Sequence, residues 1–323
     1  MCRKSRVLAT STLSLKVTMH KHLIIGLGWL GSPLALYFKS AGHTVAGTTR
    51  NAHKAESLTS QGIQTVLFDL YENDASELPH ELFQDAHVVI NIPPGRKNFE
   101  PVLFIERMKR LFDYAQQHAA LHICFISTTS VFGEIEGRVT NDSPLTPNTA
   151  SGNAHVELEH YLKSLANAVA VGHDADINAN AFNCSVLRLA GLVGNDRHPI
   201  STLSQKSDIA MGKNPVNLVH QEDVIQAIAA VLRSSGKKGS LNEAAMATSS
   251  PFENNFFAAN LCSAEHPSRE QYYTWCAEQK GIRVPQFLPD NRTQVNGKWI
   301  DAAQTITKLG LTLRYPSPYD MLG

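Results

Sequence analysis

The chain has 323 residues, of which 43% are hydrophobic and 18% are charged, as in a globular protein with one large domain or two closely joined ones. Basic and acidic side chains balance at 29 each, so the formal net charge is zero. This balance disfavours nucleic acid and anionic membranes as partners, and no apolar run reaches the roughly 20 residues of a membrane span. We expect a monomer or homodimer whose partner is a small molecule.

Five cysteines are spread along the chain without a C-x-x-C pair, and their number is odd. This distribution fits neither a zinc site nor a framework of disulfides. We expect reduced thiols, a cytoplasmic location and no bound metal. The cysteines are Cys2, Cys124, Cys184, Cys262 and Cys276.

Three segments are expected to lie outside the folded core. Residues 1 to 18, MCRKSRVLATSTLSLKVT, are basic, contain no acidic residue and lack the sustained apolar segment of a secretory signal. We interpret them as a disordered or dispensable N-terminal extension that ends just before Met19. Residues 166 to 181 and 244 to 255 show no strong periodicity, which indicates surface insertions.

The segment from residue 22 to residue 50, HLIIGLGWLGSPLALYFKSAGHTVAGTTR, predicts a strand, a tight turn, a helix and a second strand. Further strand-like runs follow, and helical segments separate most of them. Such alternation predicts an α/β fold with a doubly wound, mainly parallel sheet. These runs cover residues 64 to 70, 86 to 92, 122 to 128 and 183 to 189.

The C-terminal part predicts two amphipathic helices, over residues 268 to 281 and 301 to 310. Gly281 suits the end of the first helix. Asp301 suits the N-cap of the second helix, and Gly310 suits its C′ position. We expect this part to form a smaller lobe that leans on the sheet.

The sequence GLGWLG matches G-x-G-x-x-G at the junction of the first strand and the first helix. Gly26 permits a tight turn, Gly28 lets the backbone approach a pyrophosphate, and Gly31 allows close helix packing. Free amide groups at the start of the helix bind the anion. We interpret this segment as a dinucleotide-binding loop rather than a purely structural turn. The other two residues of the loop are Trp29 and Leu30.

The end of the second strand bears on which dinucleotide binds. An NAD site normally has an acidic residue here that binds the ribose hydroxyls, but the region reads TVAGTTRNAHK and the next acid is Glu56. Thr48, Thr49 and Arg50 instead offer hydroxyls and a guanidinium to a 2′-phosphate, and Lys54 adds charge. We expect NADP, with NAD as the alternative if Arg50 is only a solvated residue at the strand end.

Residues 151 to 159, SGNAHVELE, place three polar side chains on one stripe of a helix. Ser151, His155 and Glu159 are four positions apart and therefore share a face. A histidine that titrates near neutrality, beside a hydroxyl and a carboxylate, indicates a proton relay. The alternative is an ordinary helix start that carries polar side chains.

Three later segments carry motifs that occur together in one protein family. They are FISTTSVFG (125 to 133), RLAGLVGNDRHP (188 to 199) and VNLVHQEDVIQAI (216 to 228). In order, they resemble the S-S-x-x-V-Y-G segment, the loop after the sixth strand and the I-H-V-D-D-V-A junction of extended short-chain dehydrogenases/reductases, the NAD-dependent epimerase/dehydratase family. The likeness covers most of residues 19 to 323, and within the family the chain resembles the YeeZ-type bacterial branch.

The resemblance implies a Rossmann-like sheet of about seven strands, with a smaller C-terminal substrate lobe. The implied dinucleotide-binding domain comprises residues 19 to 190 and 221 to 262. The implied substrate lobe comprises residues 191 to 220 and 263 to 323.

The family resemblance also implies a catalytic set that this chain has altered. In the family a serine or threonine, a tyrosine and a lysine four residues after the tyrosine perform catalysis. Thr128 matches the hydroxyl position, but the tyrosine and lysine positions fall on Ser151 and His155. None of the eight tyrosines is followed four positions later by lysine, and Phe132 replaces the tyrosine of the V-Y-G segment. Either His155 assists the Ser151 hydroxyl, or it lies beside the cofactor without a chemical role.

Further candidates come from the same resemblance. Arg197 and His198 lie in a loop that faces substrate in the family, so Arg197 is expected to pair with a phosphate or carboxylate. Lys298 either faces the substrate or packs the lobe. Asp69 matches a position that contacts adenine, and Arg96 of NIPPGR is a candidate phosphate ligand. Surface solvation and turn capping are the alternatives for these side chains.

Three functional hypotheses follow. The first is an NAD(P)-binding oxidoreductase of the epimerase/dehydratase type that acts on a sugar nucleotide or another small carbonyl or hydroxyl compound. The second is a non-catalytic dinucleotide-binding sensor or scaffold, which the loss of tyrosine and lysine favours. The third is a β-hydroxyacid dehydrogenase, which residues 22 to 58 also resemble, although the sequence lacks the long helical second domain of those enzymes.

Overall fold

The computed structural model describes residues 19–95, 99–171, 182–194, 196–235, 251–252, 255–292 and 297–322. The N-terminal extension, Arg96 and most of both insertions fall outside this part of the chain. Residues 166 to 171, assigned above to the first insertion, are instead the last turns of a helix. Helical periodicity was hidden there because small residues dominate both faces.

Seven parallel strands form the central sheet, which confirms the predicted doubly wound α/β fold. They are β1 (Lys21–Ile25), β2 (Thr44–Thr49), β3 (Gln64–Leu67), β4 (Ala86–Ile90), β5 (His122–Thr128), β7 (Asn183–Leu189) and β10 (Phe256–Leu261). Their order is β10-β7-β5-β4-β1-β2-β3, so the chain moves outward from β1 to β3 and returns to the other side of β1 with β4. This reversal is a topological switch point, where open α/β sheets bind ligands.

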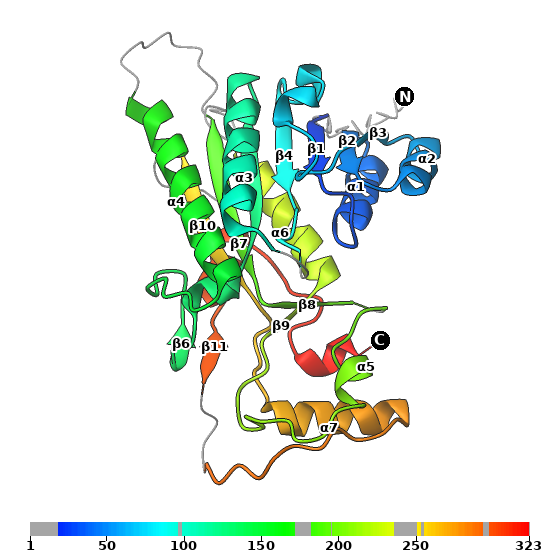
Figure 1. The fold of residues 1–323 in the computed structure, drawn as a ribbon, viewed down its shortest axis with the longest axis vertical. Helices are drawn as coiled ribbons and strands as arrows, with labels where there is room; N and C mark the ends of the chain where they lie inside the picture. Colours follow the sequence, from blue (N-terminus) through cyan, green and yellow to red (C-terminus); the bar gives the residue numbers. More distant parts are fainter. Residues whose placement is uncertain are drawn as a thin grey trace, which may run out of the picture.

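Helices cover both faces of the sheet. They are α1 (Gly31–Ser40), α2 (Ala52–Ser60), α3 (Pro101–Gln117), α4 (Ala150–Val171) and α6 (Gln221–Ser234). Successive strand residues point to opposite faces, so Ile24 packs with α1 and α6, whereas Leu23 and Ile25 pack with α3 and α4. Figure 1 shows α3 and α4 lying side by side on one face. None of the helices in the described part of the chain is long and apolar enough to cross a membrane.

A smaller lobe lies beyond the carboxyl ends of the strands, in the lower part of Figure 1. It contains the paired strands β8 (Gly191–Val193) and β9 (Leu218–His220), the helices α5 (Ile200–Leu203) and α7 (Arg269–Lys280), and the 3-10 turn η4 (Pro318–Met321). The lobe has its own apolar core around Tyr272, which is fully buried. Helix α7 confirms the helix predicted over residues 268 to 281, and Gly281 ends it in the left-handed conformation with φ 61°.

Part of the segment assigned to the lobe packs on the sheet instead. Strand β11 (Lys298–Ile300) pairs with β6 (Gly137–Val139) and leads to α8 (Ala303–Leu309). Ile300 belongs to the same apolar core as α1 and α6. Helix α8 confirms the second predicted C-terminal helix, but its N-cap is Ala302 and not the predicted Asp301. The Asp301 carboxylate, two residues before the helix, accepts a hydrogen bond from the Ala303 amide at 2.8 Å. Gly310 ends the helix with φ 59°.

Histidines gather at the amino ends of the strands, away from the lobe. His22 of β1, His87 of β4 and His122 of β5 are direct neighbours in the register of the sheet, and all three are buried. His20 and His43 complete the cluster, with ring centroids 5.3 Å from His87 and 4.9 Å from His22. We call these five residues the histidine cluster.

Four rings of the histidine cluster, those of His22, His43, His87 and His122, have pKa values below the ordinary one, which favours their neutral state. Burial, followed by repulsion from neighbouring imidazoles, lowers the pKa of His22 to about 2 and that of His87 to about 4. Burial lowers the pKa of His122 well below its ordinary value. Burial, followed by repulsion from His20 and Arg233, lowers the pKa of His43. The titratable groups that face these rings are the other histidines of the cluster and Arg233, and no carboxylate contributes.

We expect the free energy of unfolding to decrease steeply as the pH falls from 6.5 toward 4. The unfolded chain binds protons on these histidines below pH 6.5, whereas the folded chain does so near 4 at His87 and near 2 at His22. Their contribution is therefore complete above pH 6.5 and is lost on acidification. For these two groups the loss between pH 6 and pH 5 is about 2 kcal/mol.

Urea unfolding followed by circular dichroism at pH 7 and pH 5 measures this loss. His22→Phe removes one titrating ring and keeps the stacking on Phe38, whose ring lies 3.9 Å from that of His22 and within 9° of parallel. The stability difference between the two pH values should shrink by about 2 kcal/mol in this variant. An unchanged difference would show that His22 is not neutral in the folded protein at pH 5.

Candidate functional site

The turn between β1 and α1 brings backbone segments into very close approach. Gly26 has φ 102°, and a Cβ atom there would lie 2.5 Å from the carbonyl oxygen of Asn91. A Cβ atom on Gly31 would overlap the carbonyl oxygen of Gly26. Both glycines are therefore required by the packing of the protein itself.

Gly28 differs from its two neighbours in the motif. A Cβ atom there would meet nothing within 4 Å, so protein packing does not require glycine at this position. Gly28 faces a cavity of about 600 Å³ that we call the first cavity. Helix α1 begins three residues later and carries no acidic residue in its first turn, so its amide groups are available to an anion. The arrangement fits a pyrophosphate that lies against Gly28.

The wall opposite the glycine turn comes from the end of β2. Thr48 is buried, and its hydroxyl accepts a hydrogen bond from the Gly26 amide at 3.1 Å, so it supports the turn. Thr49, Arg50 and Lys54 line the first cavity. The Arg50 guanidinium is 74% exposed and lies 3.3 Å from Asp69, which lines the same cavity. Asp69 therefore offsets part of the positive charge available to a ligand.

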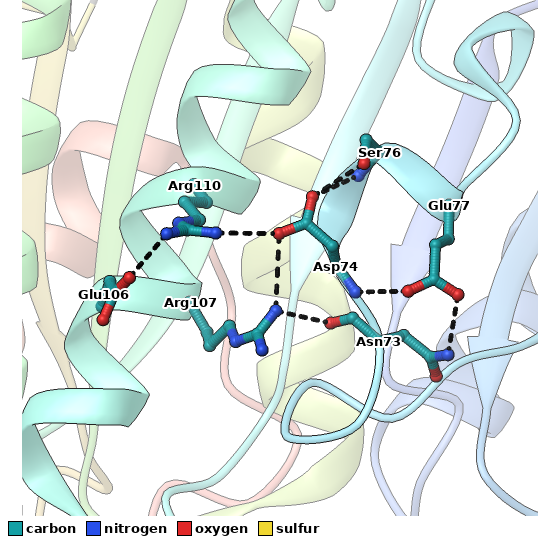
Figure 2. Close-up of polar contacts among 7 residues, drawn as sticks. All are labelled: Asn73, Asp74, Ser76, Glu77, Glu106, Arg107 and Arg110. Carbon is teal, nitrogen blue, oxygen red and sulfur yellow. Dashed lines mark hydrogen bonds and ion pairs between the residues drawn. The ribbon is translucent and has the colours of Figure 1, made fainter.

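The segment after β3 supplies Asp69, and ion pairs bind it to helix α3. Figure 2 shows Asp74 at the start of the 3-10 turn η1 (Ala75–Glu77), between the guanidinium groups of Arg107 and Arg110. These groups lie 3.4 Å and 3.1 Å from the Asp74 carboxylate. Hydrogen bonds from Ser76, followed by Arg110, lower the pKa of Asp74 to about 2. The ion pairs therefore persist over the neutral range and hold this wall in place.

A second cavity, of about 290 Å³, continues from the first across the carboxyl ends of the strands. Asn91, Ile92 and Pro93, which follow β4, line both cavities. Together the cavities form one groove over the switch point between β1 and β4. Besides Asn91, the polar side chains that line the second cavity come from distant segments: Ser127, Thr128, Ser130, Ser151, His155 and Arg197.

His155 presents one ring nitrogen to the second cavity. Its Nδ1 atom donates a hydrogen bond to the carbonyl oxygen of Ser151 at 2.8 Å, because a carbonyl only accepts. Nε2 is then the unprotonated nitrogen; it has no partner among the described residues and is not sealed from solvent. The ring stacks on Phe125, and burial lowers its pKa, opposed by the Ser151 carbonyl and Glu159. His155 is therefore a neutral acceptor at pH 7.

The three-residue relay suggested by the helical stripe is not formed. Glu159 is buried and directed away from His155 by other partners: Arg188 donates to its Oε2 atom at 2.8 and 2.9 Å, and Ser127 donates to Oε1 at 2.6 Å. The Ser151 group that contacts His155 is its carbonyl, not its hydroxyl. A buried arginine attracts the carboxylate more strongly than a neutral imidazole one helical turn away.

Arg197 reaches the second cavity by stacking on Trp29 of the glycine turn. The guanidinium carbon lies 5.2 Å from the centroid of the indole ring, and the Trp29 indole N–H donates to Asp196 at 2.8 Å. Gln221 donates to the Trp29 carbonyl at 2.7 Å. Arg197 forms no ion pair with any described residue, which leaves its charge available to an anionic ligand.

Two other predicted substrate contacts lie away from the groove. Both nitrogens of His198 are engaged: Nδ1 accepts from the Ile200 amide at 3.2 Å, and Nε2 bonds the Tyr272 hydroxyl at 2.9 Å. The Lys298 ammonium donates to the carbonyl oxygens of Thr129 and Gly133 at 3.1 and 2.7 Å. These contacts give both side chains structural partners, and neither side chain lines the groove.

The sequence did not single out every residue of the groove. Ser130 lies in the 3-10 turn η3 (Thr129–Phe132), and its hydroxyl is 2.8 Å from that of Thr128. The sequence does carry a signal for Ser130: in STTS (127 to 130), Thr128 and Ser130 are two positions apart across the end of β5. Asn91 lines both cavities. The sequence did not indicate this, because the position of Asn91 depends on the pairing of β4 with β1. Among the described residues, no three His, Cys, Asp or Glu side chains could hold a metal ion.

Two sequence comparisons relate the chain to known proteins. Residues 22–243 match the profile of the NAD dependent epimerase/dehydratase family. Protein YeeZ of Escherichia coli is 33% identical over 306 residues, which span 94% of this chain and 99% of that protein. Both matches include the glycine turn and the segments that carry Thr128, Ser151 and Arg197.

Solved structures share the fold over most of the chain. UDP-N-acetylglucosamine 4-epimerase from Methanobrevibacter ruminantium has a TM-score of 0.69 at 13% identity, covering 94% of this chain and 96% of that one. MoeE5 in complex with UDP-glucose and NAD has a TM-score of 0.68 at 18% identity, covering 93% of this chain and 96% of that one. UDP-glucuronic acid 4-epimerase from Bacillus cereus in complex with NAD has a TM-score of 0.67 at 19% identity, covering 93% of this chain and 94% of that one. At such identities the likeness establishes the fold alone.

The glycine turn yields a prediction that separates packing from ligand binding. Gly28→Ala should change the free energy of unfolding by less than about 1 kcal/mol, because its Cβ atom meets nothing in the protein. It should weaken dinucleotide binding by about tenfold or more, because the methyl group occupies the space of the pyrophosphate. Calorimetric titration with NADPH and NADH measures the affinities.

Gly31→Ala is the matched control for this variant. Its Cβ atom would overlap the Gly26 carbonyl, so it should destabilise the protein by about 2 kcal/mol or more. If Gly28→Ala bound both dinucleotides as tightly as the parent, the first cavity would not hold a pyrophosphate at Gly28.

Proposed function

Because the chain belongs to the NAD dependent epimerase/dehydratase family, we propose that it is a nicotinamide-dinucleotide-dependent oxidoreductase or epimerase. Its substrate is a small hydroxyl or carbonyl compound, of which a sugar nucleotide is the leading candidate. One observation carries the proposal: a continuous groove runs from Gly28 to His155 across the switch point of the sheet.

The residues of the first cavity fit the adenosine diphosphate half of a dinucleotide. Gly28 leaves the space for a pyrophosphate, and the amino end of α1 directs its amide groups toward it. When bound in this groove, the dinucleotide would supply a nicotinamide ring that exchanges hydride. The shared residues Asn91, Ile92 and Pro93 would then separate the phosphate end from the reacting end.

Arg50 supports a preference for NADP. Its guanidinium is exposed in the first cavity beside Thr49 and Lys54, where it matches a 2′-phosphate by charge and by hydrogen-bond geometry. The nearby Asp69 carboxylate holds the guanidinium over the cavity and accepts the Tyr71 amide at 3.0 Å. Asp69 is also the one carboxylate of this wall that is able to accept from ribose hydroxyls, which keeps NAD as the alternative.

His155 supplies the proton acceptor that the missing tyrosine supplies elsewhere in the family. With Nδ1–H fixed on the Ser151 carbonyl, Nε2 is free to accept the hydroxyl proton of an alcohol as that alcohol is oxidised. In the reverse direction the same nitrogen returns the proton to the carbonyl oxygen. The hydroxyls of Thr128, Ser130 and Ser151 line the same cavity and hold the substrate oxygen.

Arg197 gives the second cavity its charge preference. It is the cation among the residues that line this cavity, and it forms no ion pair within the described part of the chain. Stacking on Trp29 fixes the plane of the guanidinium beside the glycine turn. A substrate that carries a phosphate or carboxylate would accept two hydrogen bonds from it.

A binding protein without catalysis is the second candidate. The observation in its favour is that His155 contacts the Ser151 main chain rather than its hydroxyl, so no hydroxyl in the cavity is activated by a base. A sensor or scaffold of this kind would bind the dinucleotide with the same residues of the first cavity. It would show no turnover with any substrate class.

Replacing Arg50 tests the cofactor preference. Arg50→Ala should weaken NADPH binding by about tenfold and change NADH binding by less than about twofold, because only the 2′-phosphate loses its charge partner. Calorimetric titration of both dinucleotides measures this difference, with Arg283→Ala at an exposed position outside both cavities as control. Equal losses for both dinucleotides, or tighter binding of NADH by the parent, would contradict the assignment to NADP.

Replacing His155 tests the chemical role. Turnover is followed at the nicotinamide absorbance over sugar nucleotides, aldehydes and small ketones. His155→Gln should lower kcat by about 100-fold or more and leave dinucleotide affinity unchanged, because it removes the base alone. His160→Gln, exposed on the same helix, should leave kcat unchanged. Turnover that persists in His155→Gln would reject the base, and dinucleotide binding without any turnover by the parent would favour the sensor.

The pH dependence of kcat/KM is an independent test of His155 as the base. Burial lowers its pKa below 6.5, so the neutral, proton-accepting form dominates throughout the range above that value. In the direction of alcohol oxidation, kcat/KM should be constant from pH 7 to pH 8. It should fall about tenfold per pH unit below the pKa of His155. A rise of kcat/KM between pH 8 and pH 10 would indicate a phenol or ammonium as the base instead.

A further inference from the structure

A third cavity lies at the amino ends of the strands, away from the groove. Its volume is about 250 Å³, and most of its lining is the histidine cluster together with helices α1 and α6. The groove lies where β1 ends, at Gly26, whereas this cavity lies where β1 begins, at His20 and His22. No residue lines both, and nothing in the proposed reaction uses this cavity.

Buried ring nitrogens beside this cavity lack partners among the described residues. His22 is only 3% exposed, and both of its nitrogens are unpaired among the described residues. His87 is 4% exposed, and its Nδ1 atom is also unpaired. These three atoms are sealed even from water, so an occupant of the cavity does not reach them. The imidazole donor that the cavity offers is His43: its Nδ1 atom accepts the His20 amide at 3.2 Å, so the neutral ring carries its proton on Nε2, which is not sealed and has no partner among the described residues.

The cavity also carries an uncompensated positive charge. Arg233, in the last turn of α6, lines the cavity and forms no ion pair with any residue that the structure describes. The groups that face His22 and His43 are other histidines and this arginine, without any carboxylate. The potential inside the cavity therefore favours an anion over a cation.

The remaining walls are flat and apolar. Phe38 and Tyr37 of α1 face Ala229 and Leu232 of α6 across the cavity. The His22 ring lies parallel to that of Phe38, with centroids 3.9 Å apart, which extends the flat surface. A concave, largely apolar cavity with a few convergent polar groups is the usual form of a small-molecule site.

We propose that this cavity is a second binding site, for a small planar organic carboxylate. The carboxylate accepts hydrogen bonds from Arg233 and from the Nε2–H group of His43, and the apolar body lies between Phe38 and Leu232. A charged guanidinium and a neutral imidazole donor together suit a carboxylate, which accepts at two oxygens. The site is a binding site without a reaction of its own, and it does not depend on the function proposed for the groove.

Calorimetric titration with benzoate, with benzyl alcohol as the neutral analogue of the same shape, tests the proposal. Benzoate should bind with saturation at one site, about tenfold or more tighter than benzyl alcohol, because only the carboxylate pairs with Arg233. Arg233→Gln should weaken benzoate binding about tenfold, whereas Arg283→Gln, at an exposed position outside the cavity, should not change it. Equal affinities for benzoate and benzyl alcohol, or an unchanged affinity in Arg233→Gln, would overturn the proposal.

His43→Phe tests the second contact, since it keeps an aromatic ring and removes both nitrogens. It should weaken benzoate binding and leave that of benzyl alcohol nearly unchanged. Unchanged benzoate affinity in a folded His43→Phe protein would reject the contact. Titration in the presence of saturating NADPH locates the site. Benzoate binding that disappears with NADPH would place it in the groove and overturn the proposal, whereas unchanged binding supports it whether or not the protein catalyses any reaction.

Discussion

The close approach of the β1–α1 turn to the end of β4 is the constraint on which the rest of the molecule depends. The Asn91 amide donates to the Ile25 carbonyl at 2.9 Å, and its carbonyl leaves no space for a side chain on Gly26. This contact lies between the two strands at which the chain reverses direction across the sheet. It therefore places the turn that faces the first cavity next to the residues that lead into the second.

The second cavity depends on an ion pair that is itself buried. Glu159 of α4 and Arg188 of β7 are 2% and 7% exposed, and removing both charges from water costs several kcal/mol. The geometry offsets that cost, since Arg188 donates twice to one carboxylate oxygen and Ser127 donates to the other. The pair fixes α4 against the sheet and so places Ser151 and His155 over the ends of β5 and β7. Glu159 thus contributes to the site through position, not through chemistry.

The two ends of the sheet use histidine in different ways. At the carboxyl end, the Nδ1 atom of His155 has a partner and its Nε2 atom faces the groove, as a group that exchanges protons requires. At the amino end, five histidines lie together without an acid, and burial followed by mutual repulsion keeps the rings of His22, His87 and His122 neutral. The first arrangement suits chemistry, and the second suits recognition of a negative group.

The sequence by itself determined the α/β class, six of the seven strands of the sheet, the glycine turn and the C-terminal helices, because periodicity and turn chemistry act between residues close in the chain. Strand β10 was not predicted. It also placed Thr128, Ser151, His155 and Arg197 in one site through the family motifs. Only the tertiary structure decided the partners of Glu159, His198 and Lys298, since these partners lie 29, 74 and 169 residues away in the chain. A side chain binds whichever charged or polar group packing brings nearest, and no local pattern specifies that neighbour.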